Sequence, residues 1–345
     1  MSSEARSALV LQGGGALGAY EFGAVRRLYE EPGFAPDLIA GVSIGAITAA
    51  LLARPAKGLT PIQALSRFWE AVTVSGWFLP PPLRAYASAF GNPRFFTPRT
   101  DLFNLASWTN LYDTTPLRRT LAELVDLEAL ADPEVRPGLL VSATDVAAGE
   151  ITYFRGRDGG MGLDHILASG SLPPSFPMTW IGEKAYWDGG LFDNTPLGPV
   201  LDDLAPDGGE RIVYVLNLFP NAAPIPATLA EVSERTLNLQ FANRTREDLA
   251  LMRRFDQVAA LVDRLEALGD ANPLADTAEF KALLDRRYVR APQVVEITRP
   301  EQAGAFDGMD FSPAGIMARA DEGYAQADAA LKRRASPRPT RAKAA

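Results

Sequence analysis

The sequence contains no cysteine and a single histidine among its 345 residues. Without thiols the chain cannot form disulfides, use a cysteine nucleophile or build a zinc or iron–sulfur site that needs sulfur ligands. Because His165 is the only histidine, a Ser-His-Asp triad must use that residue or be absent. His165 lies in GLDHILASGS, near the start of an expected helix, and this position favours a structural role over a catalytic one.

The sequence also lacks an excess of positive charge and a long apolar run. The formal net charge is −8, so a nucleic acid partner is not expected. The stretch 38–53 is uncharged, but it is shorter than the ~20 residues that a membrane span needs. The first residues, MSSEARS, lack the apolar segment of a secretory signal. We therefore expect a cytoplasmic protein that could contact a membrane surface transiently.

Apolar runs and helical patterns alternate over the first hundred residues. Residues 8–12 and 37–42 have the composition of strands, and residues 16–30 and 44–53 that of helices. Such alternation is typical of a parallel sheet covered by helices. Further strands are expected at 138–144, 151–154 and 211–218. The sequence thus predicts a three-layer α/β fold with a mainly parallel central sheet and helices on both faces.

The remaining segments divide the chain further. We expect a catalytic domain over 6–220, within which the aromatic-rich and proline-rich segment 77–112 is an insertion or cap. A mainly helical extension is expected over 221–331, with helical patterns at 226–268 and 277–287 and a late strand near 293–298. Its helices could face the core or form a homo-oligomer. The basic segment 332–345 has no apolar anchors and is expected to be disordered.

The first chemical motif is the glycine-rich turn QGGGALGAY. It contains G-x-G-x-x-G through Gly13, Gly15 and Gly18, and Asp37 follows at a distance typical of a dinucleotide site. Taken alone, this motif permits a dinucleotide-binding oxidoreductase or a non-catalytic binding module.

The second motif, DLIAGVSIGA, places Ser43 between Gly41 and Gly45. A G-x-S-x-G sequence between a strand and a helix is typical of a nucleophilic serine on a sharp turn. That serine needs a proton acceptor, and Asp188 is a candidate because Gly189 and Gly190 let its backbone approach a neighbouring loop.

Together with the Asn-x-Pro turn that follows D-G-G, these motifs resemble those of the patatin-like phospholipases over about residues 8–218. The resemblance implies a serine lipid acyl hydrolase that acts on lipid or other acyl esters without a metal or organic cofactor. It further implies Ser43 as nucleophile, Asp188 as the second member of a dyad, and the backbone amides of Gly13, Gly14 and Gly15 as oxyanion hole. Leu17 stands where many members carry Arg or Lys. The segment DFSPAGIMARADEGY is similar to an extension found in some bacterial members.

Overall fold

The computed structural model describes most of the chain, and its placed residues are 6–76, 79–80, 83, 87–88, 90–204, 210–242, 245–286, 292–304 and 307–335. Parts of the predicted insertion (77–78, 81–82, 84–86 and 89) and residues 336–345 of the predicted disordered segment lie outside the described residues.

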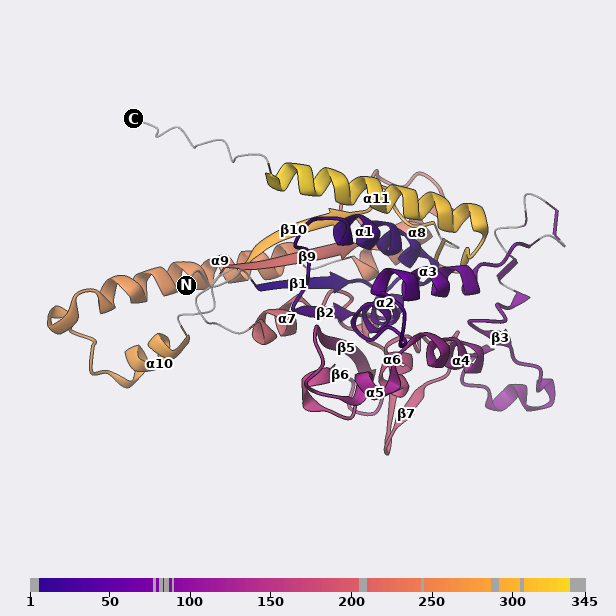
Figure 1. The fold of residues 1–345 in the computed structure, drawn as a ribbon, viewed down its shortest axis with the longest axis horizontal. Coiled ribbons are helices and arrows are strands. Elements are labelled where there is room, and N and C mark those ends of the chain that lie inside the picture. The colour runs from indigo at the N-terminus through magenta and orange to yellow at the C-terminus, as the bar shows by residue number, and fades with distance from the viewer. Residues whose placement is uncertain are drawn as a thin grey trace.

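A central eight-stranded sheet organises the molecule (Figure 1). Its strands are β1 (Arg6–Leu11), β2 (Leu38–Gly41), β5 (Gly138–Asp145), β6 (Glu150–Arg155), β7 (Thr179–Ile181), β8 (Lys184–Asp188), β9 (Arg211–Asn217) and β10 (Gln293–Thr298). The order is β10-β9-β1-β2-β5-β8-β7, with β6 also paired to β5. The first five strands in this order are parallel, whereas β6, β7 and β8 are joined by antiparallel pairings. A separate pair joins β3 (Thr97–Pro98) to β4 (Tyr112–Asp113).

Eleven α-helices surround this sheet in the described part of the chain. They are α1 (Gly18–Tyr29), α2 (Ile44–Ala53), α3 (Pro61–Val72), α4 (Thr115–Leu124), α5 (Leu127–Ala131), α6 (Leu163–Ser169), α7 (Leu197–Asp203), α8 (Leu229–Phe241), α9 (Thr245–Glu266), α10 (Ala278–Arg286) and α11 (Pro313–Ala335). The predicted mainly parallel α/β fold with helices on both faces is confirmed.

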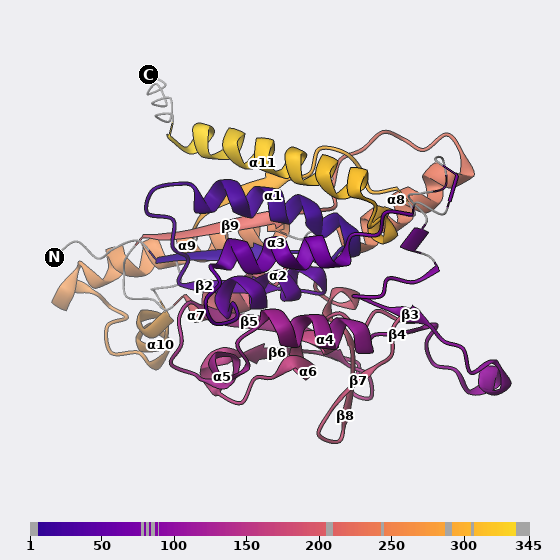
Figure 2. The same cartoon turned by 45° about the vertical axis from the view of Figure 1, so that its right-hand side comes forward.

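Alternate side chains of the sheet enter two different cores. Leu9 and Leu11 of β1 pack into the larger core, with residues of α1, α2, α3 and α11. Ala8 and Val10 face the other way and pack against α7. Because β9 is buried throughout and β1 is buried from Ala8 onward, their apolar runs suit central parallel strands. Figure 2 shows α1, α3 and α11 on the near side of the sheet.

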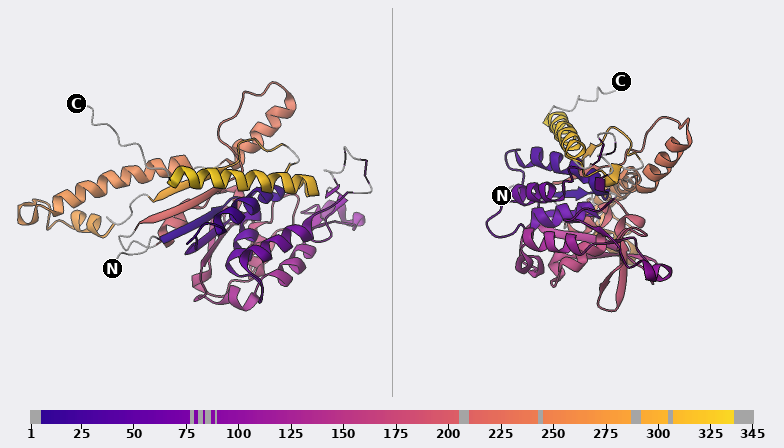
Figure 3. Two further views of the ribbon diagram at one scale, coloured as in Figure 1. Left: turned by 45° about the horizontal axis from the view of Figure 1, so that its top comes forward. Right: turned by 90° about the vertical axis from the view of Figure 1, so that its right-hand side faces the viewer.

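The predicted C-terminal extension shares the sheet and the core of residues 6–220. Strand β10 pairs with β9 as the parallel edge strand, and α11 lies along α1 (Figure 1). Helix α11 continues to Ala335, so residues 332–335 are helical, although the sequence predicted disorder from residue 332 onward. Figure 3 shows α9 and α10 reaching beyond the sheet at one end, and α8 standing away from the body near the other.

Candidate functional site

Ser43 occupies the turn between β2 and α2. Its φ of 56° and ψ of −122° make it the one non-glycine residue with positive φ in the described part of the chain. Such a backbone conformation costs about 1–3 kcal/mol and recurs at functional sites. The flanking glycines permit the turn, because a Cβ on Gly41 would lie 2.1 Å from the Gly45 carbonyl oxygen. The Ser43 amide donates to Ser169 Oγ at 3.0 Å, which fixes the turn from α6.

Asp188 ends β8 with its side chain buried, at 2% exposure. Its Oδ1 accepts the Gly190 amide at 2.8 Å, and its backbone carbonyl accepts the Thr144 hydroxyl at 2.8 Å. Burial raises the pKa of Asp188 to about 6, against the lowering effects of the Ser43 side chain and the Gly190 amide. The carboxyl therefore remains largely ionised at neutral pH but is a much better proton acceptor than a solvated aspartate.

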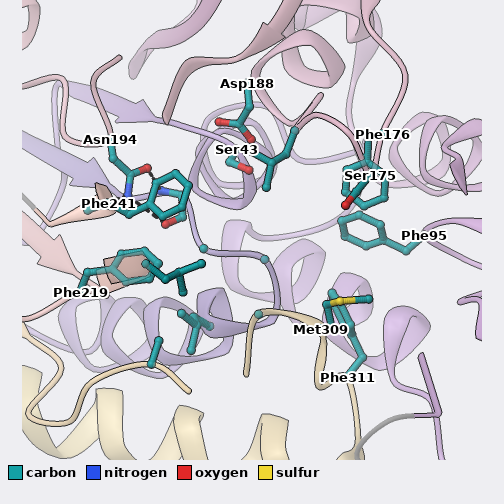
Figure 4. A pocket seen from close by; sticks show the side chains of 18 of the residues that line it. Ser43, Phe95, Ser175, Phe176, Asp188, Asn194, Phe219, Phe241, Met309 and Phe311 are labelled. Carbon is teal, nitrogen blue, oxygen red and sulfur yellow. Dashed lines mark hydrogen bonds between the residues drawn. The ribbon is translucent and has the colours of Figure 1, made fainter. Parts of the chain in front are cut away.

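Sheet register brings Ser43 and Asp188 together. Gly41 of β2 pairs with Val141 of β5, and Asp188 of β8 pairs with Ala143 of β5. Ser43 lies two residues beyond Gly41, so it reaches the level of Asp188 from the opposite side of β5. Figure 4 shows the two side chains pointing toward one another, and both residues line one cavity.

The predicted oxyanion loop, Gly13 to Gly15, lines the same cavity. The Gly13 amide is already engaged, because it donates to Asn194 Oδ1 at 2.9 Å. Among the described residues, the amides of Gly14 and Gly15 donate to no other group. Of the three amides expected to form the oxyanion hole, that of Gly13 thus bonds to Asn194 in this structure, and those of Gly14 and Gly15 are the loop's free donors.

The other motif glycines lie close to this centre. Gly18 is beside Ile44, Gly189 is beside Ser142, and Gly190 is beside both Asp188 and Asn194. They bring the backbones of the glycine loop, the serine turn and the aspartate loop close together.

Aromatic and aliphatic side chains form most of the cavity wall. The cavity has a volume of about 220 Å³. From the predicted insertion come Phe95, Phe96 and Tyr112, and Phe95 packs against Phe311 with ring centroids 5.3 Å apart. The predicted extension supplies a second group, which comprises Leu237, Phe241, Ala303, Gly304, Gly308, Met309 and Phe311. An ester with an apolar acyl chain suits such a cavity, because most of the wall is apolar and Ser43, Asp188 and the free amides meet at one part of it.

His165 lies outside this lining. Its Nδ1 accepts the Gly162 amide at 3.0 Å at the start of α6, and its ring packs edge-on against Phe154 at 4.7 Å. Burial lowers the pKa of His165. These contacts agree with the structural role expected from the sequence.

Asp37 is misplaced for a dinucleotide site. It precedes β2, and its Oδ2 accepts the Ser7 amide at 2.7 Å, at the start of β1. The glycine loop follows the C-terminal end of β1, whereas Asp37 lies at the N-terminal ends of β1 and β2, so the two lie at opposite ends of the strands. In dinucleotide-binding folds the acidic residue contacts a ribose whose pyrophosphate lies on the loop. This arrangement contradicts the dinucleotide interpretation.

Several residues of the site had no predicted role. Asn194, Ser169 and Thr144 bond directly to the glycine loop, the serine turn and the aspartate respectively. Only Asn194 had a sequence signal, the Asn-x-Pro turn.

Among the residues that the structure describes, no group of three or more histidine, aspartate or glutamate side chains is arranged to hold a metal ion. Over the same residues, no helix has both the length and the apolar character needed to cross a bilayer.

The chain matches two models of known protein families. A family model described as patatin-like phospholipase matches residues 9–201, and a second, described as patatin phospholipase, matches residues 239–343. No curated protein matches the chain. Among solved structures, the chain is similar to that described as the crystal structure of VipD from Legionella pneumophila, with 16% identity and a TM-score of 0.40. That similarity covers 96% of this chain and 67% of the other.

Proposed function

Because the chain belongs to the patatin-like phospholipase family, we propose that it hydrolyses carboxylic esters of lipids through a dyad of Ser43 and Asp188. The observation that carries the proposal is the meeting of a strained serine turn and a buried aspartate at the polar end of one apolar cavity. Membership of the family supports lipid acyl hydrolysis in general. The dyad and the acyl-enzyme are our inference from the geometry.

In the first half of the proposed reaction, Ser43 Oγ attacks the acyl carbonyl while Asp188 accepts the hydroxyl proton. The carbonyl oxygen gains negative charge, and the free amides of Gly14 and Gly15 stabilise it. The carbon–oxygen bond to the alcohol then breaks, and the alcohol leaves with the proton that Asp188 returns. An acyl ester of Ser43 remains.

In the second half, water replaces the alcohol. Asp188 accepts a proton from water as its oxygen attacks the acyl-enzyme, and the same amides stabilise the second oxyanion. Collapse releases the fatty acid and returns the proton to Ser43. The apolar wall fits the acyl chain rather than the head group, so the proposal fixes the acyl side of the substrate better than the alcohol side.

Four variants and one reagent test the proposal. A fluorescent serine-directed phosphonate should label the wild-type protein at Ser43 and leave Ser43→Ala unlabelled. Ser43→Ala and Asp188→Asn should each lower kcat for a soluble ester by about a thousandfold or more, and the double variant should be no worse than either alone. His165→Gln should keep most activity. A folded but inactive His165→Gln protein would show that the base is histidine, and the dyad would be abandoned.

A further inference from the structure

Asn194 makes an unusual set of contacts for a residue with no assigned part in the reaction. We propose that Asn194 is a positioning residue that holds the oxyanion loop in its working orientation and ties it to both the aspartate loop and α8. This inference rests on the proposed function, because it concerns the same oxyanion.

The side-chain amide of Asn194 forms hydrogen bonds with both backbone polar groups of Gly13. Its Oδ1 accepts the Gly13 amide at 2.9 Å, and its Nδ2 donates to the Gly13 carbonyl at 3.2 Å. The side chain is buried, at 7% exposure, and it fits only because Gly13 has no Cβ: such an atom would lie 2.7 Å from Oδ1. One side chain thus fixes the backbone orientation of Gly13, the residue immediately before the two free amides of Gly14 and Gly15.

A neighbouring pair of bonds strengthens this connection. Gln12 Nε2 donates to Thr195 Oγ1 at 2.6 Å, and Gln12 Oε1 accepts the Leu218 amide at 2.7 Å. The loop that carries Asp188 therefore continues into two residues, Asn194 and Thr195, that are bonded to the glycine loop. The oxyanion donors and the base are held at a fixed separation, which the transition state requires.

A third bond reaches the apolar wall. Asn194 Nδ2 also donates to the carbonyl of Phe241, the last residue of α8, at 3.2 Å. Phe241 and Leu237 of the same helix line the cavity, and the Phe241 ring packs against Phe219 with centroids 5.6 Å apart (Figure 4). A displacement of the end of α8 would therefore act on the glycine loop through one amide group.

The proposal predicts a loss of kcat rather than of substrate binding. Oxyanion donors act most strongly when the carbonyl oxygen becomes charged, so misdirected amides weaken the transition state more than the bound ester. Asn194→Ala removes every side-chain bond, and we expect kcat for a short soluble ester to fall by about 100-fold with KM changed less than about threefold. Activity is expressed per folded molecule, with the folded fraction taken from circular dichroism.

Asn194→Asp is the sharper variant because it keeps the shape of the side chain. One carboxyl oxygen can still accept the Gly13 amide, but the other faces the carbonyls of Gly13 and Phe241. Asp188 and Asn194 share the cavity lining, which contains no lysine, arginine or histidine among the described residues. Asp193, next in the chain, accepts from Tyr153 and from the Thr195 amide.

The new carboxyl can donate only while protonated. We therefore expect the Asn194→Asp enzyme to lose kcat as pH rises, through an alkaline limb that neither wild type nor Asn194→Ala has. A side chain that merely supports folding would not introduce this limb.

Asn238 provides a matched control. Its amide grips both polar groups of Ala303, at 3.0 and 2.8 Å, and donates also to the Glu234 carbonyl, but it has no contact with the glycine loop. Asn238→Asp should lower stability comparably but introduce no alkaline limb in kcat for the short ester, because its new carboxyl does not contact the glycine loop.

The outcomes separate the two proposals. If wild type is labelled at Ser43 and hydrolyses esters, but both Asn194 variants keep kcat within about threefold and show no alkaline limb, then the role of Asn194 is refuted. If Asn194→Ala does not fold, the pH profile of Asn194→Asp alone decides. If wild type is neither labelled nor active, the proposed function itself fails.

Discussion

Asp188 holds a carboxylate in a place that disfavours its charge. Burial raises its pKa to about 6, although an interaction with Ser43 and a bond from the Gly190 amide act in the opposite direction. The residue is thus tuned toward proton transfer, as a general base must be near neutral pH. In the proposed dyad a buried aspartate takes the place of histidine, because burial raises the pKa of Asp188 to near the usual range of a histidine.

This pKa sets the expected pH dependence of the reaction. The base works only when ionised, so kcat/KM should be level above pH 7 and should fall about tenfold per pH unit below the Asp188 pKa of about 6. The measurement is initial rate against pH with a neutral soluble ester, with folding followed by circular dichroism. A limb near pH 4 instead would mean that the base is solvated, and a pH-independent rate would remove Asp188 from the proton transfer.

At the scale of elements, the aromatic segment before α4 contributes directly to the cavity. Phe95 and Phe96 are buried, at 6% and 3% exposure, and both line the wall. Phe96 contacts Tyr112 with ring centroids 4.8 Å apart, and Phe95 lies 6.1 Å from Phe176. The segment therefore packs as a core element and borders the cavity at the same time.

Replacing Phe95 and Phe96 with serine should impair long-chain esters more than short ones. A long acyl chain needs the apolar wall, whereas a short soluble ester reaches Ser43 without it, so we expect about a tenfold or greater change in the ratio of kcat/KM values. Phe68→Ser is the control, because Phe68 packs against Phe95 but is not in the cavity lining. An equal loss on both esters, or none, would leave these residues with a packing role alone.

The sequence predicted elements whose side chains carry a strong local pattern. Helix α2 spans 44–53 as expected, and strands β1, β5, β9 and β10 match apolar runs. The short hairpin of β7 and β8 was not predicted, because TWIGEKAYWD mixes charged and aromatic residues without a clear period. The single helical pattern over 226–268 was also incomplete as a prediction, since α8 ends at Phe241 before α9 begins.

The site was predictable only where motifs name it. Ser43 and Asp188 follow from G-x-S-x-G and D-G-G, and the structure places them in one cavity. The bond between Gly13 and Asn194 joins residues 181 positions apart, and no local pattern encodes such a contact. The contribution of Met309 and Phe311 to the cavity wall was not predicted for the same reason, since both lie far from Ser43 in the sequence.

For the molecule as a whole, the close packing of α1 against α11 joins the N-terminal part of the chain to the C-terminal part. The backbones of α1 and α11 approach each other closely at two glycines. A Cβ on Gly23 would lie 1.7 Å from the Ala320 carbonyl oxygen, and one on Gly323 would lie 1.9 Å from the Tyr20 carbonyl oxygen. Arg27 of α1 adds an ion pair with Asp328 of α11 at 2.9 Å. Close backbone packing of this kind leaves no volume for a methyl group.

Gly23→Ala and Gly323→Ala should each lower the free energy of unfolding by about 2 kcal/mol or more. In an exposed helix the same change usually stabilises by about 1 kcal/mol, so the sign itself is informative. Gly198→Ala is the control, because Gly198 lies in α7 with nothing within 4 Å of the added methyl. Urea denaturation of the three variants measures the difference, and a gain of stability at Gly23 or Gly323 would contradict the close crossing.

The position of Met309 and Phe311 in the cavity wall also bears on the order in which the protein is made. A chain growing on the ribosome exposes Ser43 first and Asp188 much later, and both emerge long before residue 311. Until then the cavity lacks the wall that Met309 and Phe311 supply, as well as the Gly308 backbone beside Gly15. Ser43 and Asp188 are therefore translated well ahead of a complete cavity, and full assembly of the cavity has to await the residues up to Phe311.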